Sequence, residues 1–294
     1  MTKIVTSLAD ISADYAAVFC DLWGCLHNGI EPFADAVKAL ETYKANGGIV
    51  LLLTNSPRPK AGVIDQLRHI GVSDELWDEI ATSGDSARLA LSSGMVGQKV
   101  FHLGPDRDLA FYEPGTSDLL QGLEKIERTS LAGAEGIVCT GLFDDEAETP
   151  EDYRALLLEA KNRKLKFLCA NPDIIVDRGE KRVYCAGAIA AAYTEIGGES
   201  LYFGKPHPPI YDLARLRLTR LTGNSIPDKK ILCIGDGINT DIQGAMGEDI
   251  DVLFITGGLA AAETQTKAQP DPSALDNFLA QHQYDPKYSI GHLR

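Results

Sequence analysis

Asp21 directly follows an apolar run, Tyr15 to Cys20, which is typical of a strand buried on both faces. Gly24 then allows the backbone to turn. Ligands in open α/β sheets bind just past the carboxyl ends of strands. A carboxylate at such an end is suited to act as a nucleophile or as a metal ligand. A single Asp more commonly caps a loop, so the rest of the chain has to decide between these roles.

Two further carboxylates, Asp236 and Asp241, follow a second apolar run that ends at Gly235. A hard divalent cation prefers oxygen ligands, and Mg²⁺ typically uses one or two carboxylates together with substrate phosphate. Asp241 could instead cap a helix. The metal hypothesis is favoured because both carboxylates share one strand end.

A hydroxyl and an amide, from Thr54 and Asn55, follow the apolar run 49–53. Parallel strands of a βαβ unit end at the same edge of a sheet, so these side chains are expected beside Asp21. They could hold a phosphate oxygen, cap the next helix, or do both, since helix N-termini attract anions. Lys205, before Pro206, is expected in a rigid turn, although most lysines lie on the surface.

Hydrophobic periodicity predicts the elements that position these residues. Strands are expected at 15–20, 49–53, 99–103, 136–139, 166–170, 200–203, 230–235 and 252–255, and helices at 33–45, 60–70, 86–91, 119–127, 153–162, 186–196, 210–221 and 272–281.

This alternation of strands and helices predicts an α/β fold with a doubly wound, mainly parallel sheet. The middle of the chain repeats the alternation and is interpreted as a second α/β unit inserted into the first. The expected boundaries are residues 1–82 and 198–294 for the core and residues 83–197 for the insert.

Charge and composition limit the classes of partner. The chain has 294 residues and a formal net charge of −14, which argues against nucleic-acid binding. A small phosphorylated substrate remains compatible, because a metal ion and one Lys can reverse the field locally. Neither a signal peptide nor a membrane span is expected, and the six scattered cysteines contain no CxxC pair. A zinc site is not indicated, the cysteines are interpreted as small core residues, and a cytoplasmic location is expected.

In this order and placement, the motifs resemble those of the haloacid dehalogenase (HAD) superfamily of phosphohydrolases. The insert resembles the class IIA cap of the nitrophenylphosphatase-like and sugar-phosphatase branch. The stretch Asp21-Leu22-Trp23-Gly24 is similar to the sequence found at this place in a subgroup of that class. The residues that carry the resemblance are Asp21 with Gly24 and Leu26, Thr54-Asn55, Lys205-Pro206, Gly235-Asp236 through Asp241, and Asn171-Pro172-Asp173 in the insert.

The resemblance implies a Mg²⁺-dependent phosphatase of a small phosphomonoester, such as a sugar phosphate or a nucleotide-like compound. In that interpretation Asp21 attacks phosphorus and forms an aspartyl-phosphate, which water then hydrolyses. Thr54 and Asn55 bind the transferring phosphoryl group, and Lys205 neutralises charge on it and on Asp21.

The same resemblance implies a ligand set for the ion. Mg²⁺ is expected on Asp21, the backbone carbonyl of Trp23, and Asp236, while Asp241 steadies the site from nearby. The cap is expected to exclude water and to choose the substrate, with Asn171 and Asp173 as candidates. A turn after a strand explains those two residues equally well. Caps of this class often pair, so a homodimer is compatible with the resemblance.

One position departs from the family pattern. The family's phosphatases place a second Asp two residues after the nucleophile, where it protonates the leaving group, and here that residue is Trp23. Loss of general acid catalysis typically costs on the order of 10²–10⁴ in rate. Three explanations are open: a leaving group that needs no proton, a proton from the cap or from water, or poor turnover. The last gives an alternative function, a catalytically weak or inactive protein that binds or senses a phosphorylated ligand.

Overall fold

The computed structural model describes residues 2–114, 122–178 and 181–294. The chain forms two compact units. The first comprises Met1–Thr54, Ile64–Ala81 and Tyr211–Arg294, and the second comprises Asn55–Val63 and Thr82–Ile210. The core and insert boundaries expected at 82/83 and 197/198 stay a prediction. No helix among the described residues is long and apolar enough to cross a membrane.

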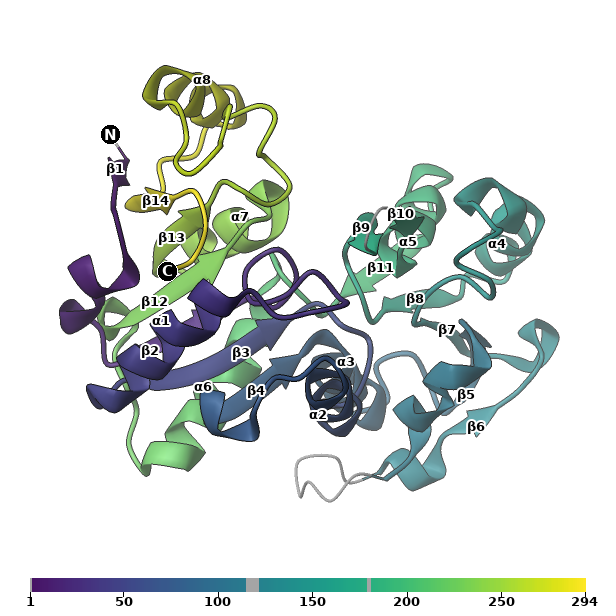
Figure 1. Ribbon diagram of the computed structural model, residues 1–294. Coiled ribbons are helices and arrows are strands. Elements are labelled where there is room, and N and C mark those ends of the chain that lie inside the picture. The colour runs from purple at the N-terminus through teal and green to yellow at the C-terminus, as the bar shows by residue number, and fades with distance from the viewer. Residues whose placement is uncertain (1, 115–121, 179–180) are drawn as a thin grey trace. The chain divides into compact units, whose positions relative to one another are not determined.

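The first unit is built on a seven-stranded sheet with the order β1-β14-β13-β12-β2-β3-β4 (Figure 1). Its strands are β1 (Lys3–Ile4), β2 (Ala17–Cys20), β3 (Ile49–Thr54), β4 (Glu79–Thr82), β12 (Ile231–Gly235), β13 (Asp251–Ile255) and β14 (Tyr288–Ile290).

Strand β2 pairs in parallel with β3 on one side and with β12 on the other. All four residues of β2 and all five of β12 are buried, because strands covered on both faces consist of continuous apolar runs. From β2 the chain first adds β3 and β4 on one side, and later adds β12, β13 and β14 on the other. The direction of strand addition therefore reverses between β2 and β12, and such reversals are where open α/β sheets bind ligands.

The second unit contains a five-stranded sheet with the order β11-β8-β7-β5-β6 and an antiparallel pair, β9 and β10. Its strands are β5 (Lys99–Leu103), β6 (Glu127–Arg128), β7 (Gly136–Cys139), β8 (Lys166–Cys169), β9 (Ile175–Arg178), β10 (Lys181–Tyr184) and β11 (Glu199–Tyr202). The helices of the chain are α1 (Ala34–Ala45), α2 (Lys60–His69), α3 (Ser83–Ser92), α4 (Arg154–Asn162), α5 (Ala186–Glu195), α6 (Pro208–Thr222), α7 (Gln243–Gly247) and α8 (Pro272–His282).

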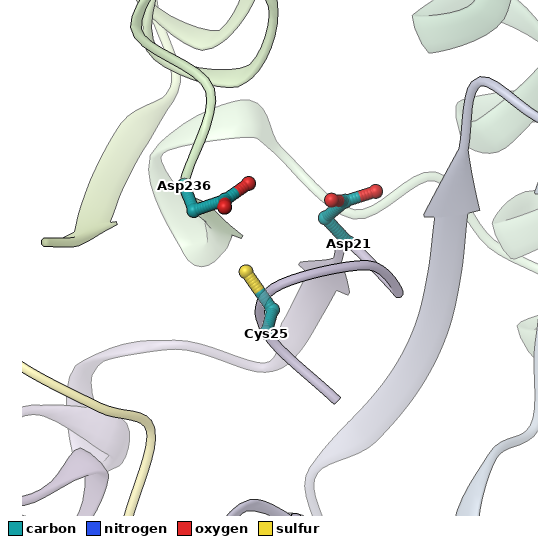
Figure 2. A group of neighbouring side chains, drawn as sticks. All are labelled: Asp21, Cys25 and Asp236. Atoms are coloured by element: carbon teal, nitrogen blue, oxygen red, sulfur yellow. The ribbon is translucent and has the colours of Figure 1, made fainter. Parts of the chain in front are cut away.

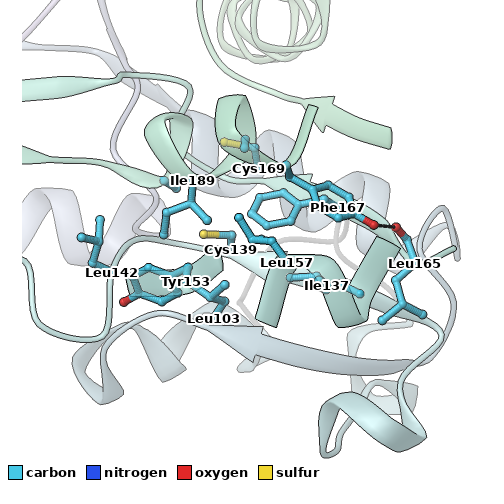
Figure 3. Packing of buried hydrophobic residues seen from close by; sticks show 14 residues of the cluster. Leu103, Ile137, Cys139, Leu142, Tyr153, Leu157, Leu165, Phe167, Cys169 and Ile189 are labelled. Atoms are coloured by element: carbon cyan, nitrogen blue, oxygen red, sulfur yellow. Dashed lines mark hydrogen bonds between the residues drawn. The ribbon is translucent and has the colours of Figure 1, made fainter. Parts of the chain in front are cut away.

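Alternate residues of the second sheet pack on opposite faces, as the period of a strand requires. Ile137 and Phe167 pack in one cluster with residues of α4 and α5 (Figure 3). Their neighbours Val138 and Leu168 pack in another cluster with residues of α3. The Tyr193 hydroxyl on α5 donates a hydrogen bond of 2.6 Å to the carbonyl of Leu165. The second unit therefore has its own core.

The predicted α/β class, with a mainly parallel sheet, is confirmed. The helix expected at 119–127 is wrong over its described part, and residues 119–121 lie outside the described residues. A 3₁₀ turn occupies Leu123–Lys125, and Glu127–Arg128 pairs with β5. Gly122 has a φ of 102°, which is incompatible with a continuous helix.

Candidate functional site

Asp21 and Asp236 follow neighbouring parallel strands, β2 and β12. The Asp21 amide donates a hydrogen bond of 2.8 Å to the carbonyl of Ile234, which fixes the register at the strand ends. The two carboxylates are 8% and 5% exposed, respectively. Figure 2 shows both side chains at the end of the sheet where the strand order reverses. The structure thus brings together the two carboxylates that the sequence singled out.

Close backbone approaches hold the Asp236 carboxylate in place. The Leu259 amide donates a hydrogen bond of 3.0 Å to Asp236 Oδ2. Gly24 has a φ of +76°, and a Cβ atom there would lie only 2.2 Å from the same oxygen. A Cβ atom at Gly258 would lie 2.0 Å from it. Both positions therefore require glycine for the carboxylate to adopt this placement.

Cys25 supplies a third potential ligand atom, which the sequence analysis had interpreted as a core residue. Its Sγ atom and one carboxylate oxygen each of Asp21 and Asp236 all lie within 4.8 Å of one another. In Figure 2 the sulfur points toward the two carboxylates. Burial raises the pKa of the Cys25 thiol well above its usual value, and the nearby charges of Asp236 and Asp21 raise it further. The one feature of the sequence that could have indicated this role is the position of Cys25, four residues after Asp21 and directly after the turn at Gly24.

Asp241 lies in the π-helical turn Ile238–Ile242 and is buried. Its Oδ2 atom accepts hydrogen bonds from the Gly237 amide at 3.1 Å and from the Thr240 hydroxyl at 3.3 Å. Among the described residues, the group of ligand atoms within 4.8 Å consists of Asp21, Cys25 and Asp236. Asp241 therefore holds the loop that follows Asp236. Thr54, the last residue of β3, is 2% exposed and belongs to the strand beside β2.

The Trp23 side chain packs within its own loop. Its ring meets the ring of His27 edge to face, with centroids 5.2 Å apart. Gly29 has a φ of +87°, and a Cβ atom there would lie 2.3 Å from the Trp23 ring. His27 is fully buried, its Nδ1 accepts a hydrogen bond of 3.0 Å from the Gly29 amide, and burial lowers its pKa to about 4. Trp23 therefore shapes the loop that follows Asp21.

In the second unit, the Asn55 side chain contacts both Lys205 and Asp173. Asn55 Oδ1 accepts a hydrogen bond of 2.7 Å from the Lys205 amide, and Asn55 Nδ2 donates one of 3.0 Å to the Lys205 carbonyl. The same Nδ2 donates a hydrogen bond of 2.8 Å to Asp173 Oδ1. Lys205 is 2% exposed. Three residues that are far apart in the sequence are thus joined by one amide group.

Asn171 has a different role from Asp173. Its Oδ1 atom accepts a hydrogen bond of 3.0 Å from the Asp173 amide, which forms an Asx turn after β8. Helix α5 approaches this turn closely, because a Cβ atom at Gly187 would lie 2.1 Å from the carbonyl of Pro172. In the same way, a Cβ atom at Gly84 on α3 would lie 2.1 Å from the carbonyl of Pro57. Both glycines bring a helix against a loop that carries a candidate residue.

The predicted site residues thus fall into two sets. The first unit holds Asp21, Trp23, Thr54, Asp236 and Asp241, and the second holds Asn55, Asn171, Asp173 and Lys205. Within the first set, two buried carboxylates with converging oxygens are a donor set that suits Mg²⁺.

Comparison with known proteins identifies similar chains. Residues 18–113 match the model of a haloacid dehalogenase-like hydrolase family, and residues 202–280 match a HAD-hydrolase-like model. The crystal structure of a hydrolase of the haloacid dehalogenase-like family from Brucella suis is 40% identical, with a TM-score of 0.86 over 99% of this chain and 100% of that chain.

Two more distant proteins are also similar. The 5'-nucleotidase YutF from Bacillus subtilis is 24% identical over 90% of this chain and 96% of its own length. A glycerol phosphate phosphatase from Mycobacterium tuberculosis, solved in complex with magnesium, has a TM-score of 0.66 and 21% identity, over 96% of this chain and 76% of that one.

Proposed function

The chain belongs to the haloacid dehalogenase-like hydrolase family, and we propose that it is a Mg²⁺-dependent phosphatase of a small phosphomonoester. The convergence of the Asp21 and Asp236 carboxylates within 4.8 Å at the reversal of strand order carries this proposal. A nucleophile needs positive charge beside it when its target is an anionic phosphoryl group. A Mg²⁺ ion shared by the two buried carboxylates would supply that positive charge.

In the proposed reaction an Asp21 oxygen attacks phosphorus, and the bond from phosphorus to the leaving oxygen breaks. Water then attacks the aspartyl-phosphate, which releases phosphate and regenerates the Asp21 carboxylate. Asp21, the Trp23 main-chain carbonyl and Asp236 would hold Mg²⁺, which would supply positive charge against the phosphoryl oxygens. Asp241 positions the loop that carries Asp236, through its hydrogen bond to the Gly237 amide.

Thr54, Asn55 and Lys205 are assigned to the phosphoryl group. The Thr54 hydroxyl and the Lys205 ammonium donate hydrogen bonds to phosphoryl oxygens, and Lys205 also offsets their charge. Asn55 fixes the backbone of Lys205 through its paired hydrogen bonds of 2.7 and 3.0 Å. Positioning and charge supply most of the catalysis in phosphoryl transfer, which suits this small set of groups.

The relatives suggest which ions and substrates to test. One relative carries the name of a 5'-nucleotidase, and another is a glycerol phosphate phosphatase that was solved with magnesium. A small phosphorylated metabolite is therefore the proposed substrate. We assign the core to residues 1–82 and 198–294 and the substrate-selecting cap to residues 83–197, with Asn171 and Asp173 as its candidates. A cytoplasmic location stays an expectation.

The test measures phosphate release from nucleoside 5'-monophosphates, glycerol 3-phosphate, dihydroxyacetone phosphate and p-nitrophenyl phosphate, with Mg²⁺ or with a chelator. We expect Mg²⁺-dependent release by the wild type and its loss in Asp21→Asn. Asp276→Asn, an exposed site on α8, makes the same chemical change as a control and is expected to keep the activity. Release that persists in Asp21→Asn, or that is absent with every substrate, would refute the proposal.

A second candidate function, binding or sensing of a phosphorylated ligand with little turnover, is favoured by Trp23. Its ring packs against His27 and carries no labile proton for a leaving group. This candidate predicts that a phosphomonoester raises the melting temperature of the protein and is recovered unchanged. Consumption of the same compound by the wild type excludes it.

A further inference from the structure

The Cys25 sulfur lies beside the proposed Mg²⁺ ligands, although Mg²⁺ does not favour sulfur ligands. Mg²⁺ binds oxygen atoms in a strict octahedral geometry, whereas thiolate sulfur favours Zn²⁺ and other thiophilic ions. Yet Cys25 Sγ lies within 4.8 Å of a carboxylate oxygen of Asp21 and of one of Asp236. The side chain is 1% exposed, so the sulfur is fixed in this place by packing. The donor set of this chain therefore contains two hard atoms and one soft atom.

A cavity lies beside the loop that carries Cys25. It has a volume of about 270 Å³ and lies within the first unit. Cys25 and Gly24 form one part of its wall, and Asp35, on the first turn of α1, and His292 form another. This space, which can hold several water molecules, therefore borders the Gly24–Cys25 segment of the loop.

The dimensions of the cluster are close to those that a zinc site requires. In tetrahedral geometry, Zn–S bonds of about 2.3 Å and Zn–O bonds of about 2.0–2.2 Å place the ligand atoms roughly 3.3–3.7 Å apart. The three atoms lie within 4.8 Å of one another, so side-chain rotations that bring them closer by up to about 1 Å place them on one ion. Among the described residues, no other group of His, Cys, Asp and Glu has this property.

We propose that Cys25 turns the Asp21–Asp236 pair into a binding site for Zn²⁺ and other thiophilic divalent cations. Zn²⁺ binds the Cys25 sulfur and one oxygen each of Asp21 and Asp236, and water fills the remaining position. The proton of the thiol leaves to solvent as the Zn–S bond forms, and no electron is transferred. Zn²⁺ then excludes Mg²⁺, and this competition, unlike the binding itself, rests on the proposed function.

The test uses the purified full chain and Co²⁺ as a spectroscopic substitute for Zn²⁺. A Co²⁺–thiolate bond produces a charge-transfer band in the near ultraviolet. We expect this band in the wild type, its loss on addition of Zn²⁺, and its absence in Cys25→Ser, which exchanges the soft donor for a hard one. Cys139→Ala, at a buried cysteine of β7, is the matched control and is expected to keep the band.

Affinities measured by calorimetry give the size of the effect. Cys25→Ser is expected to weaken Zn²⁺ binding by on the order of 100-fold, since even an outer partner of a metal ligand changes affinity 10–100-fold. Mg²⁺ affinity is expected to change by less than about 3-fold, because the carboxylates remain. X-ray absorption of the Zn²⁺-loaded wild type needs no variant and is expected to show one sulfur at about 2.3 Å.

A wild type that binds Co²⁺ without the band, or zinc without a sulfur neighbour, overturns the proposal, as does equal Zn²⁺ affinity in Cys25→Ser. The failure of this inference differs from that of the phosphatase. Mg²⁺-dependent phosphate release without a sulfur signal refutes the zinc site alone. A sulfur signal in a chain that releases no phosphate refutes the phosphatase and leaves the zinc site standing.

Discussion

The hydrogen bond between the Asn55 and Asp173 side chains can be tested by exchanging the two residue types, with Asn55→Asp and Asp173→Asn. Asn55 Nδ2 donates hydrogen bonds to Asp173 Oδ1 at 2.8 Å and to the Lys205 carbonyl at 3.0 Å. Asn55→Asp has the same shape but removes both donors, and it places a carboxylate against two acceptors. Its remaining acceptor still receives the Lys205 amide.

The magnitude follows from the two bonds that are lost. A hydrogen bond to a charged group contributes about 1.5–3 kcal/mol and a neutral one about 1 kcal/mol, so we expect Asn55→Asp to lower the free energy of unfolding by about 3 kcal/mol. For units of this size, 1 kcal/mol corresponds to a shift of roughly 2–4 °C in melting temperature. The expected decrease is therefore roughly 6–12 °C, measured by calorimetry on the full chain.

A double-mutant cycle isolates the contact. In Asn55→Asp with Asp173→Asn, the amide at 173 donates to the carboxylate at 55, which restores one of the two bonds. We expect a coupling energy of about 1.5–3 kcal/mol. Asn162→Asp, at an exposed position at the end of α4, is the control and is expected to cost less than about 1 kcal/mol. Additive effects of the two changes, or an Asn55→Asp variant as stable as the wild type, would refute the assigned contact.

Three other outcomes are expected. Gly24→Ala places a Cβ atom 2.2 Å from Asp236 Oδ2 and therefore displaces a proposed Mg²⁺ ligand. Calorimetry should show that Mg²⁺ affinity falls by at least about tenfold. Gly47→Ala, which has a similar φ of +88° and nothing within 4 Å, controls for backbone strain and should bind Mg²⁺ normally. We expect Trp23→Asp to raise the rate constant of phosphate release by about 10²-fold, and an unchanged constant would mean that another group already protonates the leaving group. Burial lowers the pKa of His102 below 6.5, so the folded state holds this side chain neutral more strongly than the unfolded state does. The contribution of His102 to stability is therefore complete above that pH and is lost as the pH falls. Between about pH 7.5 and about pH 5.5, the melting temperature should fall less in His102→Gln than in the wild type.

The sheet that carries Asp21 and Asp236 was predictable from sequence, because strands buried on both faces are continuous apolar runs. The runs that form β2, β3 and β12 each end at a polar side chain, and that repetition predicted a shared edge. The resemblance to the haloacid dehalogenase family, drawn from the same residues, is confirmed by the matching family models.

Other features leave no local pattern in the sequence. Asn55 and Asp173 are 118 residues apart, so nothing in either stretch predicts their hydrogen bond. Cys25 has the apolar character of a core residue, and only the turn at Gly24 directs its sulfur toward the carboxylates. The antiparallel pair β9 and β10 was missed because apolar and polar residues do not alternate along either strand. Trp23 was interpreted as a missing acid, and its packing on His27 emerged only from the structure.

The close approaches at Gly84 and Gly187 restrict how this protein can vary. Each glycine lies against a carbonyl oxygen, of Pro57 and Pro172 respectively, with no room for a methyl group. A selection from random libraries at these two positions should therefore return glycine almost alone. Because each helix lies this close to its loop, a new loop conformation at Pro57 or Pro172 would require the helix to move as well.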